Sequence, residues 1–232
     1  MNIKGSVALV TGANRGLGRA FAQALLAAGA SKVYAAARDP SSVTLPGVHP
    51  IKLDVTNPED VAAAAKACSD VTLVINNAGI FRTAPILSND SPENIRAQMD
   101  TNFYGTLAIS TAFAPILKAN GGGAIVNILS VLSWVALPGT ALYSASKAAA
   151  WALTNALRKE LRADNTLVVG VHVGYMDTDM AAHAQGPKSD PAAVANQVLS
   201  AIEAGREEVL ADAISRQVKA GLSAEPPIYL AT

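Results

Sequence analysis

Several features that mark particular classes of protein are scarce in this sequence. Its 232 residues include a single cysteine, and aromatic residues make up only 5% of the chain. One cysteine, Cys68, excludes an internal disulfide, as is typical of proteins from reducing compartments. The formal net charge is zero. The composition therefore gives no indication of a nucleic-acid or other polyanionic partner.

Long apolar runs and clustered metal ligands are also missing. No run of about 20 apolar residues occurs, so we expect no membrane-spanning helix. The first residues, M-N-I-K-G-S, lead into V-A-L-V without the pattern of a secretory signal peptide. From these absences we expect a cytoplasmic protein. His49, His172 and His183 share no ligand spacing, and we predict no metal site.

Short apolar runs alternating with helix-forming segments are abundant. This alternation predicts a parallel sheet covered by helices on both faces. The length suits one domain, residues 1–232, with a cofactor-binding N-terminal half and a catalytic and substrate-binding C-terminal half. We predict strands over residues 6–11, 32–37, 48–53, 71–75, 124–129, 167–173 and 207–210. We predict helices over residues 19–28, 57–69, 91–120 with breaks near Gly105 and Pro115, 140–163, 191–204 and up to about 219.

A glycine-rich turn follows the first predicted strand. Residues 11–18 read T-G-A-N-R-G-L-G and lead into a helix rich in Ala and Leu. Glycines let the backbone turn tightly and approach a pyrophosphate at a helix N-terminus. Strand, turn, helix and strand together predict a dinucleotide-binding unit. A glycine loop that binds nothing is the alternative, and the position after the first strand argues against it.

Tyr143 and Lys147 lie four residues apart in a segment of good helix formers. Positions i and i+4 share a helix face, so a phenol and an ammonium would project together. Lowering a tyrosine pKa by ~2–3 units requires roughly 3–4 kcal/mol. A cation at about 4 Å supplies ~4 kcal/mol at an effective dielectric of about 20. Tyr143 is therefore a candidate acid–base group, and an exposed surface pair is the alternative.

Further motifs follow one another in a recognisable order. N-N-A-G at residues 76–79 follows the fourth strand, Asn102 lies in the next helix, and Ser130 comes thirteen residues before Tyr143. With the G-x-x-x-G-x-G turn and Y-x-x-x-K, the chain resembles the short-chain dehydrogenase/reductase family over most of its length. This agreement of several motifs removes the surface-pair alternative for Tyr143 and Lys147.

The resemblance implies a doubly wound Rossmann fold with a sheet of about seven strands, in the order 3-2-1-4-5-6-7. It also implies a catalytic group of four residues. Tyr143 would protonate a carbonyl oxygen, and Ser130 would donate a hydrogen bond to that oxygen. Lys147 would lower the tyrosine pKa and hold the nicotinamide ribose. Asn102 would support a water-linked proton route through Lys147, or be purely structural.

The family pattern also implies which residues surround the cofactor, with Asp54 near the adenine amine and Thr178 near the nicotinamide carboxamide. The full set is Gly12, Asn14, Arg15, Gly16, Leu17, Gly18, Arg38, Asp54, Val55, Asn76, Ala78, Gly79, Tyr143, Lys147, Gly174 and Thr178. One departure stands out, because the family usually has Pro-Gly where this chain has Val173-Gly174. Without that proline, we expect the backbone beside the nicotinamide to be less fixed.

The choice between NAD and NADP depends on Arg15 in the glycine turn and Arg38 just past the second strand. An NAD site uses a carboxylate for the ribose 2′-hydroxyl, whereas an arginine accommodates a 2′-phosphate. Asp39 is the competing carboxylate. Two guanidinium groups against one carboxylate favour NADP(H) over NAD(H), unless both arginines are merely solvated. Asp177 and Asp179 resemble a metal pair, but carboxylates at a helix start are the preferred explanation.

Apolar residues flank the predicted catalytic positions and suit a hydrophobic ketone or aldehyde. The predicted substrate residues are Phe81, Trp134, Leu137, Tyr175 and Met176, with Trp134 foremost. The wider wall adds Ile80, Val131, Leu132 and Leu142, of which several could equally be core. Residues 179–190 are predicted to form a short lid, because Gly186-Pro187 disfavours a long helix.

We therefore expect an NADPH-dependent carbonyl reductase, reversible as an alcohol dehydrogenase. A 3-oxoacyl-carrier-protein reductase and a non-catalytic NADP-sensing protein are the alternatives. The first would need a basic docking patch, and Lys188 is the only basic residue of residues 179–190. We expect a small-molecule partner and a homodimer or homotetramer built through helices near residues 97–117 and 148–161. The apolar residues 226–230 should pack on their own subunit or a neighbour.

Overall fold

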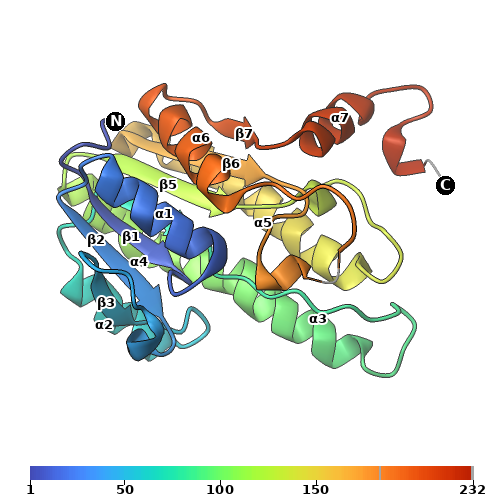
Figure 1. Cartoon of the computed structure of the whole chain (residues 1–232), viewed down its shortest axis with the longest axis horizontal. Coiled ribbons are helices and arrows are strands. Elements are labelled where there is room, and N and C mark those ends of the chain that lie inside the picture. Colours follow the sequence, from blue (N-terminus) through green and yellow to red (C-terminus); the bar gives the residue numbers. More distant parts are fainter. Residues whose placement is uncertain (183, 231–232) are drawn as a thin grey trace.

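The described residues, 1–182 and 184–230 of the computed structural model, form one sheet of seven parallel strands (Figure 1). The strand order β3-β2-β1-β4-β5-β6-β7 confirms the predicted doubly wound Rossmann arrangement. The order reverses between β1 and β4, and such a switch point opens a crevice at the carboxyl ends of the strands. The strands are β1 (Val7–Thr11), β2 (Lys32–Ala37), β3 (His49–Lys52), β4 (Leu73–Asn76), β5 (Gly123–Ile128), β6 (Thr166–His172) and β7 (Glu208–Leu210).

Helices cover both faces of the sheet (Figure 1). The helices are α1 (Gly16–Ala27), α2 (Pro58–Ala67), α3 (Ser91–Met99), α4 (Gly105–Ala119), α5 (Ala141–Glu160), α6 (Pro191–Glu203) and α7 (Ala213–Gly221). Short helical turns are η1 (Pro40–Ser42), η2 (Asp100–Tyr104), η3 (Val131–Ser133), η4 (Arg162–Asp164), η5 (Asp179–Ala181) and η6 (Ile228–Leu230). Both α3 and α7 lie beyond the arrowhead end of β5, where the site is built.

Two apolar layers hold the helices to the sheet. Alternate strand residues point to opposite faces, so Leu73 packs toward α1 and α6 while Val74 packs toward α2, α4 and α5. Both residues are fully buried, which explains why the central strands are apolar at nearly every position. The edge strand β3 differs, because His49, Pro50 and Lys52 are exposed. A strand with one neighbour tolerates proline and polar residues.

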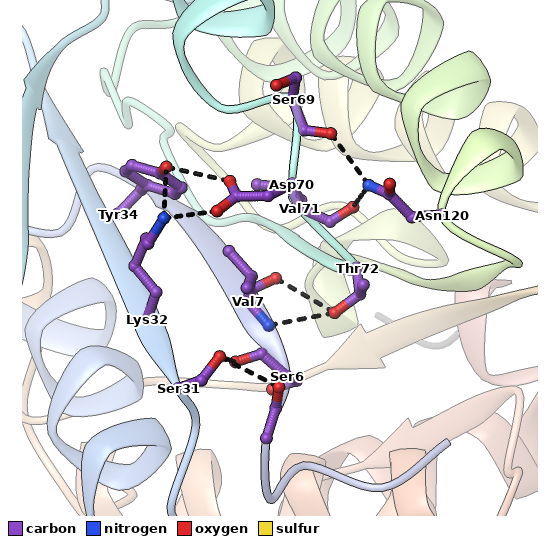
Figure 2. Close-up of polar contacts among 11 residues, drawn as sticks. Ser6, Val7, Ser31, Lys32, Tyr34, Ser69, Asp70, Val71, Thr72 and Asn120 are labelled. Carbon is purple, nitrogen blue, oxygen red and sulfur yellow. Dashed lines mark hydrogen bonds and ion pairs between the residues drawn. The ribbon is translucent and has the colours of Figure 1, made fainter.

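Polar contacts join the amino ends of β1, β2 and β4, at the end of the sheet opposite the crevice (Figure 2). The Asp70 carboxylate accepts hydrogen bonds from the Lys32 ammonium and the Tyr34 hydroxyl. The Thr72 hydroxyl accepts from the Val7 N–H and donates to the Val7 carbonyl in β1. Asn120, at the end of α4, donates to the Val71 carbonyl, shortly before β4. These contacts hold the strand starts in register, at the end of the sheet opposite the crevice.

The long helical segment differs from the prediction at Pro115. We expected a break there, but α4 continues through Pro115 to Ala119. Proline removes only its own N–H from the hydrogen-bond ladder, and the neighbouring Phe113 and Leu117 are fully buried against the sheet. The predicted break near Gly105 is present, as the π-helical turn η2 directly before it. At the other end of the chain, α1 begins inside the glycine turn at Gly16, three residues before the prediction.

The C-terminal segment packs on its own chain. Ile228 lies against Gly221 and joins a small apolar cluster with Val131, Leu132 and Val218, whereas Tyr229 and Leu230 are exposed. The contact made by Ile228 agrees with the expectation that this apolar segment packs on its own subunit. Among the described residues, every helix falls short of the length or apolarity that crossing a membrane requires.

The buried face of α4 gives a stability prediction. Leu117→Ala should lower the free energy of unfolding by about 2–5 kcal/mol, because it removes buried methyl groups and leaves a cavity. Leu87→Ala is the matched control, since Leu117 is 0% exposed and Leu87 is 96% exposed. The control should stay within about 0.5 kcal/mol of the parent in urea unfolding. Equal losses in the two variants would contradict the layer assignment.

Candidate active site

The glycine turn forms a close-packed cradle between β1 and α1. A Cβ atom on Gly18 would lie 2.1 Å from the Gly12 carbonyl oxygen and 2.6 Å from Asn77 Nδ2, so only glycine fits there. Gly12 itself has a φ of +64°, which also favours glycine. Arg15 is the N-cap of α1, and its side chain makes no capping hydrogen bond. The first N–H groups of α1 thus fit an anionic group such as a pyrophosphate.

Two residues outside the predicted set hold this cradle in place. The Thr11 hydroxyl accepts hydrogen bonds from the backbone N–H groups of Asn77 and Ala78, each at 3.0 Å. Asn77 Nδ2 donates to the carbonyls of Thr11 and Gly12 at 2.8 and 3.2 Å. The ends of β1 and β4 are therefore joined directly beside the turn. Both residues stand inside the quoted motifs, but only their long-range contacts reveal this role.

The neighbouring Asn76 side chain points the other way, into the core. It is buried, and its Nδ2 donates to Ser110 Oγ at 3.2 Å and to Asn127 Oδ1 at 2.9 Å. Asn76 ends β4, and successive residues of a strand face opposite sides. The strand period therefore separates the two asparagines, and Asn77 rather than Asn76 directs its amide to the glycine turn.

Asn102 lies on the π-helical turn η2, a kind of irregularity that often occurs at functional sites. Its Oδ1 accepts from the Ile80 N–H at 2.9 Å, and its Nδ2 donates to the Ile80 carbonyl at 3.0 Å and to Ser146 Oγ at 2.9 Å. A Cβ on Gly79 would lie 3.2 Å from Asn102 Oδ1 and 3.7 Å from Lys147 Nζ. Asn102 thus ties the loop after β4 to α5, beside Lys147. This is a structural role, one of the two that the sequence left open.

Tyr143 and Lys147 both lie on α5, with the Lys147 Nζ 5.7 Å from the centroid of the tyrosine ring. Lys147 is 5% exposed, and its Nζ donates to the Ile128 carbonyl at 2.8 Å. Burial lowers the pKa of this ammonium to about 8. The helix therefore brings a partly dehydrated cation next to the phenol, at the end of β5.

The structure does not show the expected lowering of the tyrosine pKa. Burial raises the pKa of Tyr143 to about 12, and the Ser130 hydroxyl opposes this rise. The expectation assumed a cation at about 4 Å from the phenol oxygen, whereas the Lys147 ammonium is bound to the Ile128 carbonyl. Desolvation disfavours the phenolate and outweighs the Ser130 hydrogen bond, which favours it. With its pKa raised, the phenol keeps its proton at neutral pH.

Ser130 is fixed by the turn that follows β5. Its hydroxyl accepts from the Leu132 N–H at 3.1 Å, and Ser133 completes a capping box. His172 Nδ1 lies 3.1 Å from the Ser130 carbonyl. Burial lowers the pKa of His172 to about 4, so the ring is neutral and its Nδ1–H donates to that carbonyl. Backbone and side chain of Ser130 are both held beside Tyr143.

The predicted substrate residues fall into different environments. Phe81 packs edge-on against the Tyr143 ring, with centroids 4.9 Å apart. Leu137 and Tyr175 are exposed, while Met176 packs against the core on the α1 and α6 side. Trp134 stacks on His172 at 3.7 Å. Phe81, rather than Trp134, is therefore the aromatic ring in contact with Tyr143, and substrate binding by Trp134 stays a prediction.

Arg15 and Arg38 differ in their surroundings. Arg15 forms an ion pair of 2.9 Å with Asp179 at the start of the predicted lid. Arg38 is exposed, and its guanidinium pairs with none of the described residues. The competing Asp39 carboxylate accepts from the Ser41 N–H and hydroxyl at 2.9 and 2.7 Å, which lowers its pKa. Among the described residues Arg38 thus has no ionic partner, whereas one carboxylate oxygen of Asp39, Oδ1, is engaged by Ser41.

The remaining predicted cofactor residues line the same end of the sheet. Asp54 accepts from the Thr56 N–H and hydroxyl, and Val55 is buried against Gly105 at the start of α4. Thr178 lies against the glycine turn, because a Cβ on Gly16 would come 3.2 Å from its methyl carbon. The structure therefore brings residues from both halves of the chain to one crevice.

The predicted lid is short, and its end pairs with the loop that follows β6. Its described residues contain only one short turn, η5, and Met176 pairs with Ser189 in an isolated bridge. Within the described ranges, no group of three or more His, Cys, Asp or Glu side chains could hold a metal ion. His183, one of the three histidines of the sequence, lies outside the described residues. The Asp177–Asp179 alternative is weakened, because Asp179 pairs with Arg15.

Comparisons with known proteins agree with this geometry. Residues 6–188 match the short chain dehydrogenase family. A short chain dehydrogenase from Burkholderia cenocepacia, solved in complex with NADP, is 45% identical, with a TM-score of 0.93 over 97% of this chain and 96% of that one. A 3-ketoacyl-(acyl-carrier-protein) reductase from Brucella melitensis, complexed with NADH, is 25% identical, with a TM-score of 0.82 over 89% of this chain and 96% of that one.

A curated relative points the same way. The 3-oxoacyl-acyl-carrier-protein reductase of Vibrio cholerae is 34% identical over 190 residues, which cover 78% of this chain and 77% of the relative. These likenesses, together with a glycine cradle, a Ser-Tyr-Lys group and a seven-stranded parallel sheet, have one explanation. The chain is an oxidoreductase that belongs to the short-chain dehydrogenase family.

Proposed function

We propose that this oxidoreductase reduces a hydrophobic ketone or aldehyde to an alcohol with NADPH, in a reversible reaction. The observation that carries the proposal is the neutral Tyr143 phenol, which contacts the Ser130 hydroxyl and has the buried Lys147 ammonium 5.7 Å from its ring centroid. Phe81 lies against the phenol ring and gives its surroundings an apolar side. A site for binding alone would have no need of a buried cation beside a tyrosine.

The chain's own residues fit the cofactor. We propose one domain in which the glycine turn and the first N–H groups of α1 hold the pyrophosphate, and Arg38 holds the 2′-phosphate. Three observations support this assignment: Arg38 pairs with none of the described residues, Ser41 engages Oδ1 of Asp39, and the Burkholderia relative was solved with NADP. When bound, the nicotinamide supplies the hydride, and the protein supplies binding and orientation.

The proton in reduction comes from Tyr143. Its O–H bond breaks as a new O–H bond forms on the carbonyl oxygen of the substrate, while the carbonyl carbon receives the hydride. Ser130 donates a hydrogen bond to the same oxygen. The phenolate left behind is stabilised by the Lys147 ammonium, since an opposite charge favours the ionised form. Asn102 holds the Ile80 loop against α5 and so keeps this group assembled.

A second candidate is the reduction of a 3-oxoacyl group on a carrier protein, favoured by the names of the Vibrio and Brucella relatives. A carrier with an acidic surface would require a basic patch, and Lys188 is the only basic residue of residues 179–190. Simple hydrophobic ketones and a 3-oxoacyl carrier, each assayed with NADPH, separate the two. A preference for the carrier of more than about tenfold in kcat/KM, or about 1.4 kcal/mol, would reverse the ranking.

A homodimer or homotetramer formed through α4 and α5 also belongs to this proposal. The outer side of α5 carries a hollow of about 490 Å³. Its lining residues are Trp151, Ala152, Asn155, Ala156, Lys159 and Glu160. An indented helix face of this kind, with a tryptophan and two alanines beside polar residues, suits packing against a second helix.

Replacing the proton donor tests the proposed reaction most directly. Tyr143→Phe should lower kcat/KM for a hydrophobic ketone by about 10²–10⁴-fold, the usual contribution of a general acid. NADPH binding, measured by the cofactor's fluorescence, should be retained because the ring stays in place. Tyr229→Phe, at the exposed C-terminal turn, is the matched control and should behave like the parent. Parent-level turnover by the Tyr143 variant would show that the phenol is not the acid.

Cofactor preference should depend on Arg38. Arg38→Gln should raise the KM for NADPH by roughly 10–100-fold, because a charge-assisted hydrogen bond is worth about 1.5–3 kcal/mol. The KM for NADH should change little, since it has no 2′-phosphate. Arg206→Gln removes an exposed arginine far from the turn and controls for net charge. An equal effect of Arg38→Gln on both cofactors would refute the 2′-phosphate contact.

The reduction should also have a basic limb set by Lys147. As the pH rises through about 8, the lowered pKa of this lysine, the ammonium loses its proton and the phenolate loses its support. The kcat/KM for the ketone should thus be level below pH 8 and fall above it. Lys147→Arg, which stays charged, should lack this limb in whatever activity remains. A parent profile that stays level to pH 10 would contradict the assignment.

A further inference from the structure

Asp212, in the connection between β7 and α7, contacts three separate segments of the chain. It is the N-cap of α7, and its Oδ1 accepts from the Ser215 N–H at 2.8 Å. Its Oδ2 accepts from the Gly174 N–H at 2.6 Å and from the Ser189 hydroxyl at 3.3 Å. One carboxylate therefore joins the start of α7, the loop after β6 and the end of the lid.

The start of α7 approaches Gly174 so closely that a side chain at position 174 would not fit without a shift. A Cβ atom at position 174 would lie 2.7 Å from Ile214 Cγ2 and 3.2 Å from Asp212 Oδ2. The start of α7 is thus packed directly on the backbone of Gly174. A hydrogen bond from a backbone N–H to an ionised carboxylate is also stronger than one between neutral groups. The loop after β6 is held by packing and by charge together.

The lid is anchored at the same junction. The Ser189 N–H donates to the Tyr175 carbonyl at 2.8 Å, and the Asp177 N–H donates to the Ser189 carbonyl at 3.0 Å. The returning end of the lid therefore pairs with the loop that leaves β6. Asp212 contacts both arms of this base, at Gly174 and at Ser189. Neither arm can move without breaking a bond to the same carboxylate.

We propose that Asp212 is a positioning residue that restrains residues 174–178 and the base of the lid. The inference rests on the proposed function, because Thr178 of this segment lies against the glycine turn that would hold the pyrophosphate. A proline at position 173 would impose such a restraint covalently, because it restricts its own φ and the conformation of the residue before it. Here a side chain from the C-terminal region supplies the restraint through hydrogen bonds, so α7 becomes part of the cofactor site.

The test separates positioning from helix capping. Asp212→Ser keeps a good N-cap for α7, because a serine hydroxyl reaches the N–H of the third helical residue. The shorter side chain cannot reach Gly174 or Ser189. Asp190→Ser is the matched control, because Asp190 caps α6 at the end of the lid through the Ala192 and Ala193 N–H groups. Ser189→Ala is a milder variant that removes only the contact between Ser189 and Asp212.

The first readout is amide hydrogen exchange of the ligand-free protein, which does not depend on turnover. Asp212→Ser should speed exchange of residues 174–178 and 184–190 by about tenfold or more, the equivalent of about 1.4 kcal/mol of lost protection. Ser189→Ala should affect residues 184–190 alone, and Asp190→Ser neither segment. Equal exchange in the Asp212 and Asp190 variants would overturn the proposal, because Asp212 would then be a helix cap and nothing more.

The second readout is rescue by a proline at position 173, whose fixed φ would restrain the same loop. Val173→Pro, added to Asp212→Ser, should restore slow exchange of residues 174–178 and recover kcat/KM for NADPH, which Asp212→Ser lowers by about tenfold. Val173→Pro alone should change little. If the proline restores neither slow exchange nor kcat/KM, a loosened loop after β6 does not explain the loss. The positioning role of Asp212 would then be refuted. If the parent protein reduces no ketone, the proposed function fails, while the exchange results still decide the role of Asp212.

Discussion

The site depends on one buried hydrogen bond, from Lys147 Nζ to the Ile128 carbonyl. Burying an ammonium costs free energy unless a polar group accepts its hydrogen bonds. Here the Ile128 carbonyl, at the end of β5, accepts one. The bond fixes α5 against β5 at the level of Ser130, so that Tyr143 comes to the same end of the sheet. The lowered pKa of Lys147 is the consequence of this burial. Such perturbed groups are characteristic of functional sites.

Buried polar side chains extend this support behind the crevice. Asn102 joins the Ile80 backbone to Ser146, which donates to the Tyr143 carbonyl at 2.7 Å. On the same face of the sheet, Asn127 accepts from Asn76 and donates to Thr154 on α5. Networks of this kind require one arrangement of the helices on the strands, since a displaced partner would leave a buried group unsatisfied. They explain how the face of α5 that carries Tyr143 and Lys147 is held rigidly against the sheet.

The two halves of the chain meet in the crevice and are connected across it. Arg15 of the glycine turn pairs with Asp179 of the lid, and Thr178 lies against Gly16. Further along, Asp212 connects the loop after β6 to α7. The C-terminal region therefore acts on the same end of the sheet as the N-terminal cradle.

Local patterns in the sequence were enough to predict the alternation of strands and helices, the strand order through the family resemblance, and the spacing that places Tyr143 and Lys147 on one helix face. These features depend on neighbours a few residues apart. Tertiary structure decided that α4 continues through Pro115, that Asn77 rather than Asn76 faces the glycine turn, and that Phe81 contacts Tyr143. It also decided that burial raises the pKa of Tyr143. Packing and desolvation depend on residues distant in the chain, and no local pattern contains that information.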